Sequence, residues 1–235
     1  MTPVTQPAVV LPSRPLERVE LNEQVYEAVR ELLLSDQLAP GQRLSLNQIA
    51  DDLSVSRSPV HHALTRLVGE GLISVEPRRG YFVRPLTAEM AVHAYDVRLA
   101  LELSAVETCI GAVPAEKLAR LRAFMEATLV AVDGERLVDK RGYIRANQAF
   151  HQYLVELAGN PLLSSIYAQL AVNLLMERIL GPGEPPVGAV ADEHRRIVEA
   201  LEDADLPAAR EAIRDHVETG KRLAVAAIDG AGGSL

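Results

Sequence analysis

Apolar residues recur every three or four positions along most of the chain, in segments that glycine and proline residues separate. Over residues 21–85 this pattern predicts three helices followed by a hairpin. Beyond residue 86 it shows no strand signal and predicts helices over 87–110, 114–132, 135–158, 161–180, 188–203 and 207–228. The predicted fold class is mainly α, with a small N-terminal domain and a C-terminal all-α helical bundle (residues 86–235) of about 150 residues.

The start of the chain is expected to be unstructured. Residues 1–20 hold four prolines and show no periodicity, which predicts a disordered arm. The first helix is expected to begin near Asn22, a favourable N-cap residue, with Leu21 and Tyr26 forming a hydrophobic staple around the cap. Its buried stripe is predicted to consist of Val25, Val29, Leu32 and Leu33.

The stretch from Ser45 to Val83 has the pattern of a helix, a tight turn, a second helix and a hairpin. Ser45 is predicted to cap the first helix, and Gln48 completes a capping box. The second helix carries Pro59 in its first turn, where a missing N–H costs nothing. The hairpin strands are predicted over Leu72–Val75 and Tyr81–Val83, on either side of the basic tip Pro77-Arg78-Arg79-Gly80.

A helix-turn-helix followed by a basic hairpin is a winged helix, which places its second helix in the major groove of DNA. The alternative is a small helical subdomain that binds no nucleic acid. We favour the winged helix because caps, turn, stripes and tip all agree with it. The candidate DNA-binding residues on the outward side of the second helix and at the tip are Arg57, Ser58, His61, His62, Thr65, Arg66, Arg79 and Gly80.

The net charge of −8 argues against DNA binding only until its distribution is considered. Residues 55–85 contain five arginines against two glutamates, a balance of +3. Residues 86–235 contain 15 basic and 22 acidic residues, a balance of −7. The basic surface is therefore local to the winged helix, and the acidic remainder should discourage other contacts with phosphate.

The composition also indicates the cellular compartment in which the protein is expected. A single cysteine, Cys109, excludes an internal disulfide and suits a reducing cytosol. No run approaches eighteen consecutive apolar residues, and the N-terminus lacks the features of a signal peptide. We therefore expect a cytoplasmic protein with no membrane partner.

A second group of polar residues lies on inward-facing helical stripes. Asn147 and His151 are four apart on one predicted helix, and His194 and His216 lie on the stripes of two later helices. Buried polar groups need partners, and a divalent metal would satisfy all four, since imidazole nitrogen and amide oxygen are both metal ligands. The alternative is that each histidine is hydrogen-bonded separately in the core, and spacing alone leaves both open. Zinc is the expected ion, with nickel, manganese or iron as alternatives.

The N-terminal pattern resembles a known family. The segment LAPGQRLSLNQIADDLSVSRSPVHHALTRLVGEGLISVEPRRGYFV is similar to the DNA-binding domain of GntR-type bacterial transcription regulators, whose usual pattern is close to LAPGERLSE..LAE.LGVSRTPVREAL..L..EGLV...P.RG..V. The resemblance implies a homodimer that binds a palindromic operator in double-stranded DNA. The family's Arg-Glu after Pro-Val is His61-His62 here, so the operator is expected to differ from the family's common one.

Residues 87–228 resemble the FCD type of effector domain found in FadR-like regulators. The resemblance implies a metal in a cavity where small organic acids bind. Asn147 stands where the family commonly has Asp, and losing that charge should weaken metal binding. The matching segments are Arg98-Leu-Ala-Leu-Glu102, Asn147-Gln-Ala-Phe-His151, Glu193-His194 and Arg214-Asp-His216.

Arg98 is the first candidate for binding the carboxylate of an effector, in bidentate fashion. The alternative is a structural ion pair with Glu102 one helical turn further on. Arg145, Asn173 and Arg178 are further candidates for the lining of an effector cavity.

Two function classes follow from these residues. The first is a transcription regulator whose grip on DNA changes when a small acid binds. The second is a metalloenzyme, in which three histidines and a weak ligand leave room for an activated water. The sequence favours the regulator, because it has no general-base motif for the metal and the enzyme gives the winged helix no purpose.

Overall fold

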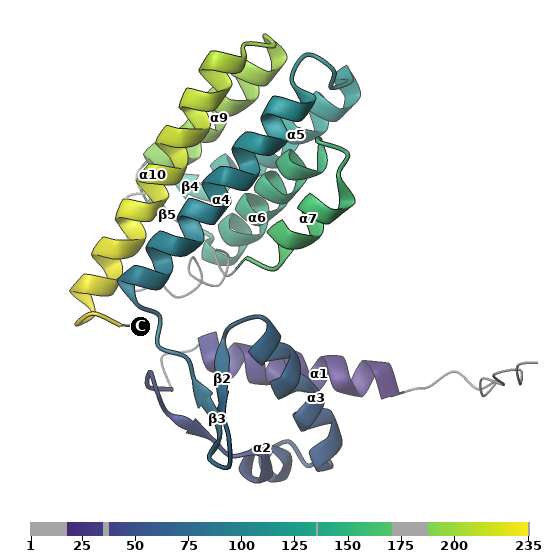
Figure 1. The fold of residues 1–235 in the computed structure, drawn as a ribbon, viewed down its shortest axis with the longest axis vertical. Coiled ribbons are helices and arrows are strands. Elements are labelled where there is room, and N and C mark those ends of the chain that lie inside the picture. Colours follow the sequence, from purple (N-terminus) through teal and green to yellow (C-terminus); the bar gives the residue numbers. More distant parts are fainter. Residues whose placement is uncertain (1–17, 35–37, 135, 171–187, 235) are drawn as a thin grey trace, which may run out of the picture.

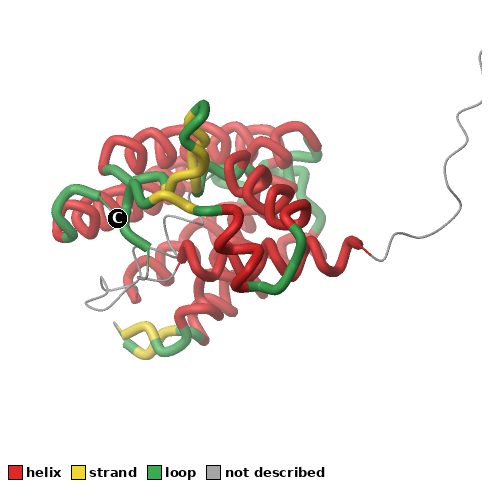
Figure 2. Tube along the Cα trace, turned by 90° about the horizontal axis from the view of Figure 1, so that it is seen from below, coloured by secondary structure: helices red, strands yellow, loops and turns green. Residues whose placement is uncertain are grey.

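The structure, a computed structural model, describes residues 18–34, 38–134, 136–170 and 188–234. Figure 1 shows an N-terminal domain with a small sheet and, joined to it at the start of α4, a bundle of long helices. Figure 2 shows helices throughout, with strands in only a few short places. The predicted fold class, a winged helix-turn-helix followed by an all-α bundle, is confirmed. Within the described residues no helix is long and apolar enough to cross a membrane.

In its described residues the N-terminal domain contains three helices and three antiparallel strands, in the order β1-β3-β2. One apolar cluster joins them, and Val60, Leu64 and Leu67 of the helix α3 are completely buried in it, as their spacing predicts. The elements are α1 (Arg18–Leu34), β1 (Arg43–Leu44), α2 (Leu46–Asp52), α3 (Arg57–Gly69), β2 (Ile73–Glu76) and β3 (Gly80–Val83).

The start of α1 differs from the prediction. The helix is already formed at Arg18, so Asn22 lies inside it and is not its N-cap. Leu21 is 43% exposed and forms no staple with the buried Tyr26. The end of the predicted disordered arm is therefore helical, and residues 1–17 lie outside the described residues.

The cap of α2 is half of the predicted capping box. The Ser45 hydroxyl accepts a hydrogen bond from the backbone N–H of Gln48 at 3.3 Å. The Gln48 side chain, however, donates to Asp52 Oδ1 at 2.9 Å, one turn further on, instead of returning to Ser45. The single serine contact still satisfies one of the free N–H groups at the start of the helix.

Six described helices form the bundle. α10 lies along both α4 and α9, and α5 lies along both α6 and α9 (Figure 1). Thr87, Asp139, Asn160 and Asp205 cap four of these helices through side-chain oxygens, which accept backbone N–H bonds. The helices are α4 (Ala88–Cys109), α5 (Ala115–Val130), α6 (Lys140–Glu156), α7 (Pro161–Ala168), α9 (Gly188–Glu202) and α10 (Leu206–Gly230).

Two predicted helices of the bundle are too long. The helix expected over 135–158 begins at Lys140, because β4 (Val132–Asp133) and β5 (Arg136–Leu137) pair as a small hairpin that the sequence did not predict. The helix expected over 161–180 ends at Ala168, and its predicted part beyond residue 170 lies outside the described residues.

The two domains meet at a very short joint. The backbone N–H of Arg84 donates to the Leu72 carbonyl of the N-terminal domain at 3.0 Å. The side chain of Leu86, two residues later, is buried in the apolar core of the bundle. Thr87, the N-cap of α4, forms a β-bridge with Ser234 beyond the end of α10. Pro85 alone separates residues that are anchored in different domains.

Candidate metal centre and DNA interface

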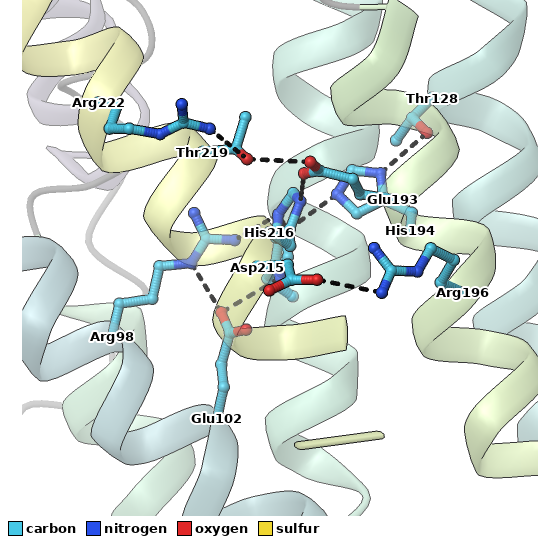
Figure 3. Close-up of polar contacts among 11 residues, drawn as sticks. Arg98, Glu102, Thr128, Glu193, His194, Arg196, Asp215, His216, Thr219 and Arg222 are labelled. Carbon is cyan, nitrogen blue, oxygen red and sulfur yellow. Dashed lines mark hydrogen bonds and ion pairs between the residues drawn. The ribbon is translucent and has the colours of Figure 1, made fainter. Parts of the chain in front are cut away.

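Three histidines from three helices meet in the centre of the bundle. His151 of α6, His194 of α9 and His216 of α10 are 2%, 0% and 3% exposed. The Nε2 atom of His151 lies 3.0 Å from the Nε2 atom of His194 and 3.0 Å from that of His216. Figure 3 shows His194 and His216 turned toward each other between their helices. The structure thus brings together the three histidines that the sequence placed on inward stripes.

Each ring has an oxygen next to its other nitrogen. His216 Nδ1 lies 3.1 Å from Glu193 Oε2, His194 Nδ1 lies 3.3 Å from Thr128 Oγ1, and His151 Nδ1 lies 3.2 Å from Glu102 Oε1. Thr128 donates its own hydrogen to the Met125 carbonyl at 2.7 Å, so its oxygen is an acceptor toward His194. At His216 and His194 these oxygens favour the tautomer with hydrogen on Nδ1, which leaves a lone pair on Nε2. His151 Nδ1 lies near Glu102 but forms no hydrogen bond within the described residues.

The donor set fits a divalent metal ion. His151 Nε2 lies 3.0 Å from the Nε2 atoms of both His194 and His216, and with hydrogen on every Nδ1 these lone pairs repel one another if nothing lies between them. An ion bound to imidazole nitrogens at about 2.0–2.1 Å places those nitrogens roughly 3.0–3.4 Å apart. Hydrogen bonds among the rings, the alternative that spacing left open, require a hydrogen on one of these Nε2 atoms.

Burial keeps these rings neutral. Burial, with the nearby Arg98 guanidinium, lowers the pKa of His151 to about 4 even though Glu102 opposes the shift. Burial and the neighbouring histidines and Arg98 hold the pKa values of His194 and His216 well below the usual range. Neutral imidazole is the form that binds metals, so the rings need no deprotonation at neutral pH.

An ion pair lies directly beside the histidines. Arg98 Nε donates to Glu102 Oε1 at 2.7 Å, and both side chains are buried, at 3% and 0% exposure. Arg98 Nη2 also lies 3.2 Å from His216 Nε2 (Figure 3). Burial opposes the ionisation of Glu102, but Arg98 and His151 hold the pKa of its carboxyl well below the usual range. Arg98 therefore forms the structural ion pair and still reaches the histidine cluster.

The other residues predicted for this centre have different outcomes. Asn147 is buried on α6, one turn before His151. Arg145 is exposed, so it does not line the interior. Asn173 and Arg178 lie outside the described residues.

Sequence reasoning missed the partner from α7. Tyr167 donates its hydroxyl hydrogen to Glu102 Oε1 at 2.6 Å, which helps to fix that carboxylate below His151. Thr128, and Thr219, which donates to Glu193 Oε1 at 2.9 Å, were also missed. The sequence shows that these hydroxyl groups lie on otherwise apolar helical stripes, but it does not show which residue each of them contacts.

The predicted DNA face is exposed along α3. Arg57, Ser58, His61, His62 and Thr65 all lie on its solvent side. The ring of His61 lies edge-on to the ring of Tyr81 of β3, with centroids 6.4 Å apart, so the helix and the hairpin adjoin. At the hairpin tip Arg79 pairs with Glu76, and Gly80 has a φ of +102°, which favours glycine.

Arg66 lies apart from the other candidates. Its guanidinium pairs with Glu23 at 2.8 Å and with Glu70 at 3.1 Å. The same group covers the ring of Tyr26 at 3.5 Å from its centroid. These contacts hold Arg66 against α1, so the structure does not bring it to the face that carries His61 and His62.

Comparison with known proteins agrees with this arrangement. Residues 21–83 match the family of bacterial regulatory proteins called gntR, and residues 93–219 match the FCD domain. The chain belongs to the GntR family. It is a DNA-binding transcription regulator with an FCD effector-binding domain, and it is not an enzyme.

Relatives of this GntR regulator extend over most of its length. An HTH-type transcriptional regulator of Streptomyces ambofaciens is 34% identical over 82% of this chain and 80% of its own. The regulator YdhC of Bacillus subtilis is 30% identical over 82% and 86%. Among solved structures, McbR/YncC of Escherichia coli is 25% identical, with a TM-score of 0.64 over 86% of this chain and 95% of that one.

The buried ion pair of the GntR regulator should matter more than a surface pair on the same helix. Glu102→Gln leaves the Arg98 guanidinium buried without a counter-charge, so the free energy of unfolding should fall by about 3–5 kcal/mol. Glu107→Gln is the matched control, because Glu107 pairs with Arg210 at 2.6 Å on the exposed side of α4. It should cost less than about 1 kcal/mol. Urea titration of both variants measures the difference, and equal losses would contradict it.

Proposed function

We propose that this protein is a ligand-responsive regulator that binds a palindromic operator as a homodimer. In this proposal a divalent metal is held by Asn147, His151, His194 and His216, and a small organic acid binding at the same centre alters the affinity for DNA. The observation that carries the proposal is the meeting of three buried Nε2 atoms beside the Arg98 guanidinium. This cluster of polar groups in an apolar core is costly to bury, and a bound ion and its ligand would compensate that cost.

The charges around the centre favour an anionic ligand. The three imidazole rings and Asn147 are neutral, and the charge of Glu102 is matched by Arg98. Glu193 beside His216 Nδ1 adds one negative charge. A bound divalent ion adds two positive charges and supplies open coordination positions for carboxylate oxygens. A carboxylate near Arg98 would also accept the Nη2 hydrogen bond that now points to His216. A mono- or dicarboxylate therefore fits better than a neutral ligand.

The helices give the centre a route to the DNA-binding domain. His216 lies on α10, which is packed along α4, and α4 begins directly after the joint at Pro85. A ligand changes DNA affinity only as far as it favours one arrangement of the two domains over another. Couplings of this kind are usually about 1–3 kcal/mol, or roughly 5–150-fold in affinity.

On the DNA side, α3 is the proposed recognition helix. Arg57, Ser58, His61, His62 and Thr65 are exposed along it and would face the major groove. The proposed wing contacts are Arg79 and Gly80. Two copies related by a two-fold axis would match the two halves of a palindrome, and such a regulator acts in the bacterial cytoplasm, where the chromosome lies.

The first prediction concerns the recognition helix. Arg57→Ala should weaken binding to an operator selected from random duplexes by about 1–3 kcal/mol if Arg57 reads a base. Arg210→Ala is the control, because Arg210 is exposed near the start of α10 and pairs with Glu107 at the end of α4 away from the joint, so the operator affinity of this variant should be unchanged. Fluorescence anisotropy measures both. Operator affinity equal to wild type in Arg57→Ala would count against the placement of α3 in the groove.

The second prediction concerns the metal. Protein purified without chelators should contain about one divalent ion per chain. His194→Ala should lose the ion and melt at a lower temperature, whereas Asn147→Asp should hold it more tightly, since a carboxylate adds charge to the ligand set. His93→Ala, at an exposed position of α4, is the control. Elemental analysis and metal titration test this, and a protein that neither contains nor binds a divalent ion contradicts it.

The third prediction joins the two sites. Small carboxylates that raise the melting temperature of the protein should change its operator affinity by about 5–150-fold. Removing the metal should abolish that response and leave DNA binding itself largely intact. Thermal-shift screening followed by operator titration measures both effects. The proposal fails if neutral ligands bind best, or if the metal-free protein responds to the acid as strongly as the metal-loaded one.

A further inference from the structure

The third strand of the N-terminal sheet brings an arginine to the wing from outside the hairpin. β1 pairs with β3, with Arg43 opposite Phe82 and Leu44 opposite Tyr81. Leu44 is buried in the domain core, so Arg43 lies on the opposite, solvent-exposed face of the sheet. The strand is fixed by backbone hydrogen bonds, including Val83 N–H to the Gln42 carbonyl at 2.8 Å. The position of Arg43 therefore does not depend on its side chain.

The Arg43 side chain extends toward the tip of the wing. The point where a Cβ would stand on Gly80 lies 3.8 Å from Arg43 Nε and 3.9 Å from its Nη2. Arg79 places its guanidinium 5.2 Å from the ring centroid of Phe82, the residue opposite Arg43. Two guanidinium groups thus lie around Gly80 and Phe82, and one of them comes from a strand that precedes the helix-turn-helix.

The charges at the tip are not balanced. Arg43, Arg78 and Arg79 are opposed there by Glu76, which pairs with Arg79. In the described part of the chain Arg43 and Arg78 form no ion pair. An exposed guanidinium whose charge is unmatched, held near the tip of a DNA-binding wing, is suited to bind phosphate through paired N–H bonds.

The geometry points to a backbone contact: we propose that Arg43 binds a DNA phosphate beside the wing. Tyr81 lies on the opposite face of the sheet from Arg43, next to His61 of the recognition helix. Arg43 is thus on the side of the wing turned away from the groove that α3 would enter, where the sugar–phosphate backbone and not a base edge would meet it. Such contacts fix the register of a protein on DNA without reading sequence.

The test is the salt dependence of binding to two duplexes, one of random sequence and one selected from a random pool. The inference rests on DNA binding through the winged helix, so wild-type protein is titrated in the same series. Arg43→Ala should weaken binding to both duplexes by a similar factor, about tenfold. The slope of log K against log salt should become shallower by about one for each phosphate that the variant no longer binds. Arg43→Lys should keep the wild-type slope.

Arg136→Ala, an exposed arginine of β5 in the bundle, is the matched control and should keep both affinity and slope. A wild-type protein that binds neither duplex would overturn the proposed function itself. Wild-type affinity and slope in Arg43→Ala would overturn only the phosphate contact. Weaker binding with an unchanged slope, or weaker binding confined to the selected duplex, would also overturn it, because the first indicates a role in the fold of the wing and the second a base contact.

Discussion

Three imidazole rings meet at one buried point of the bundle, and the surrounding helices have to hold them there. With hydrogen on each Nδ1, the Nε2 lone pair of His151 repels those of His194 and His216 at 3.0 Å, so the rings by themselves do not hold α6, α9 and α10 together. The surrounding apolar core does this. Phe150, completely buried, lies against both His151 and His194, with ring centroids 4.9 and 4.5 Å apart. The bundle thus stabilises an arrangement of polar groups that favours an added cation.

Periodicity predicted the parts of the fold that extend over several turns, because a long stripe has to be buried. It placed His151, His194 and His216 on inward faces and gave the bounds of most helices within a few residues. It missed β1 and the β4–β5 hairpin, since strands of two residues have no period to detect. Tyr167 was missed for another reason: its bond to Glu102 joins residues 65 positions apart, and such contacts depend on the tertiary fold.

The position of Arg66 on its helix did not predict where its side chain lies. Its position on α3 is exposed, as the helical pattern predicts, yet its long side chain bends back over Tyr26 to reach Glu23 of α1. Arg43 is the opposite case, because it precedes the helix-turn-helix in sequence and only the pairing of β1 with β3 brings it to the wing. For flexible charged side chains, the partner within reach decides the direction more than the face of the element does.

The joint at Pro85 has a mechanical consequence. The residues on either side are anchored in different domains, and the proline ring fixes its own φ angle. Relative motion of the domains is thus confined to a few backbone torsions, chiefly the ψ angles of Arg84 and Pro85. A connection with so little slack transmits a change in the direction of α4 as a rotation, with the DNA-binding domain as the lever arm. Displacement then grows with distance from the joint, so a small rotation moves the outermost groups of that domain the furthest.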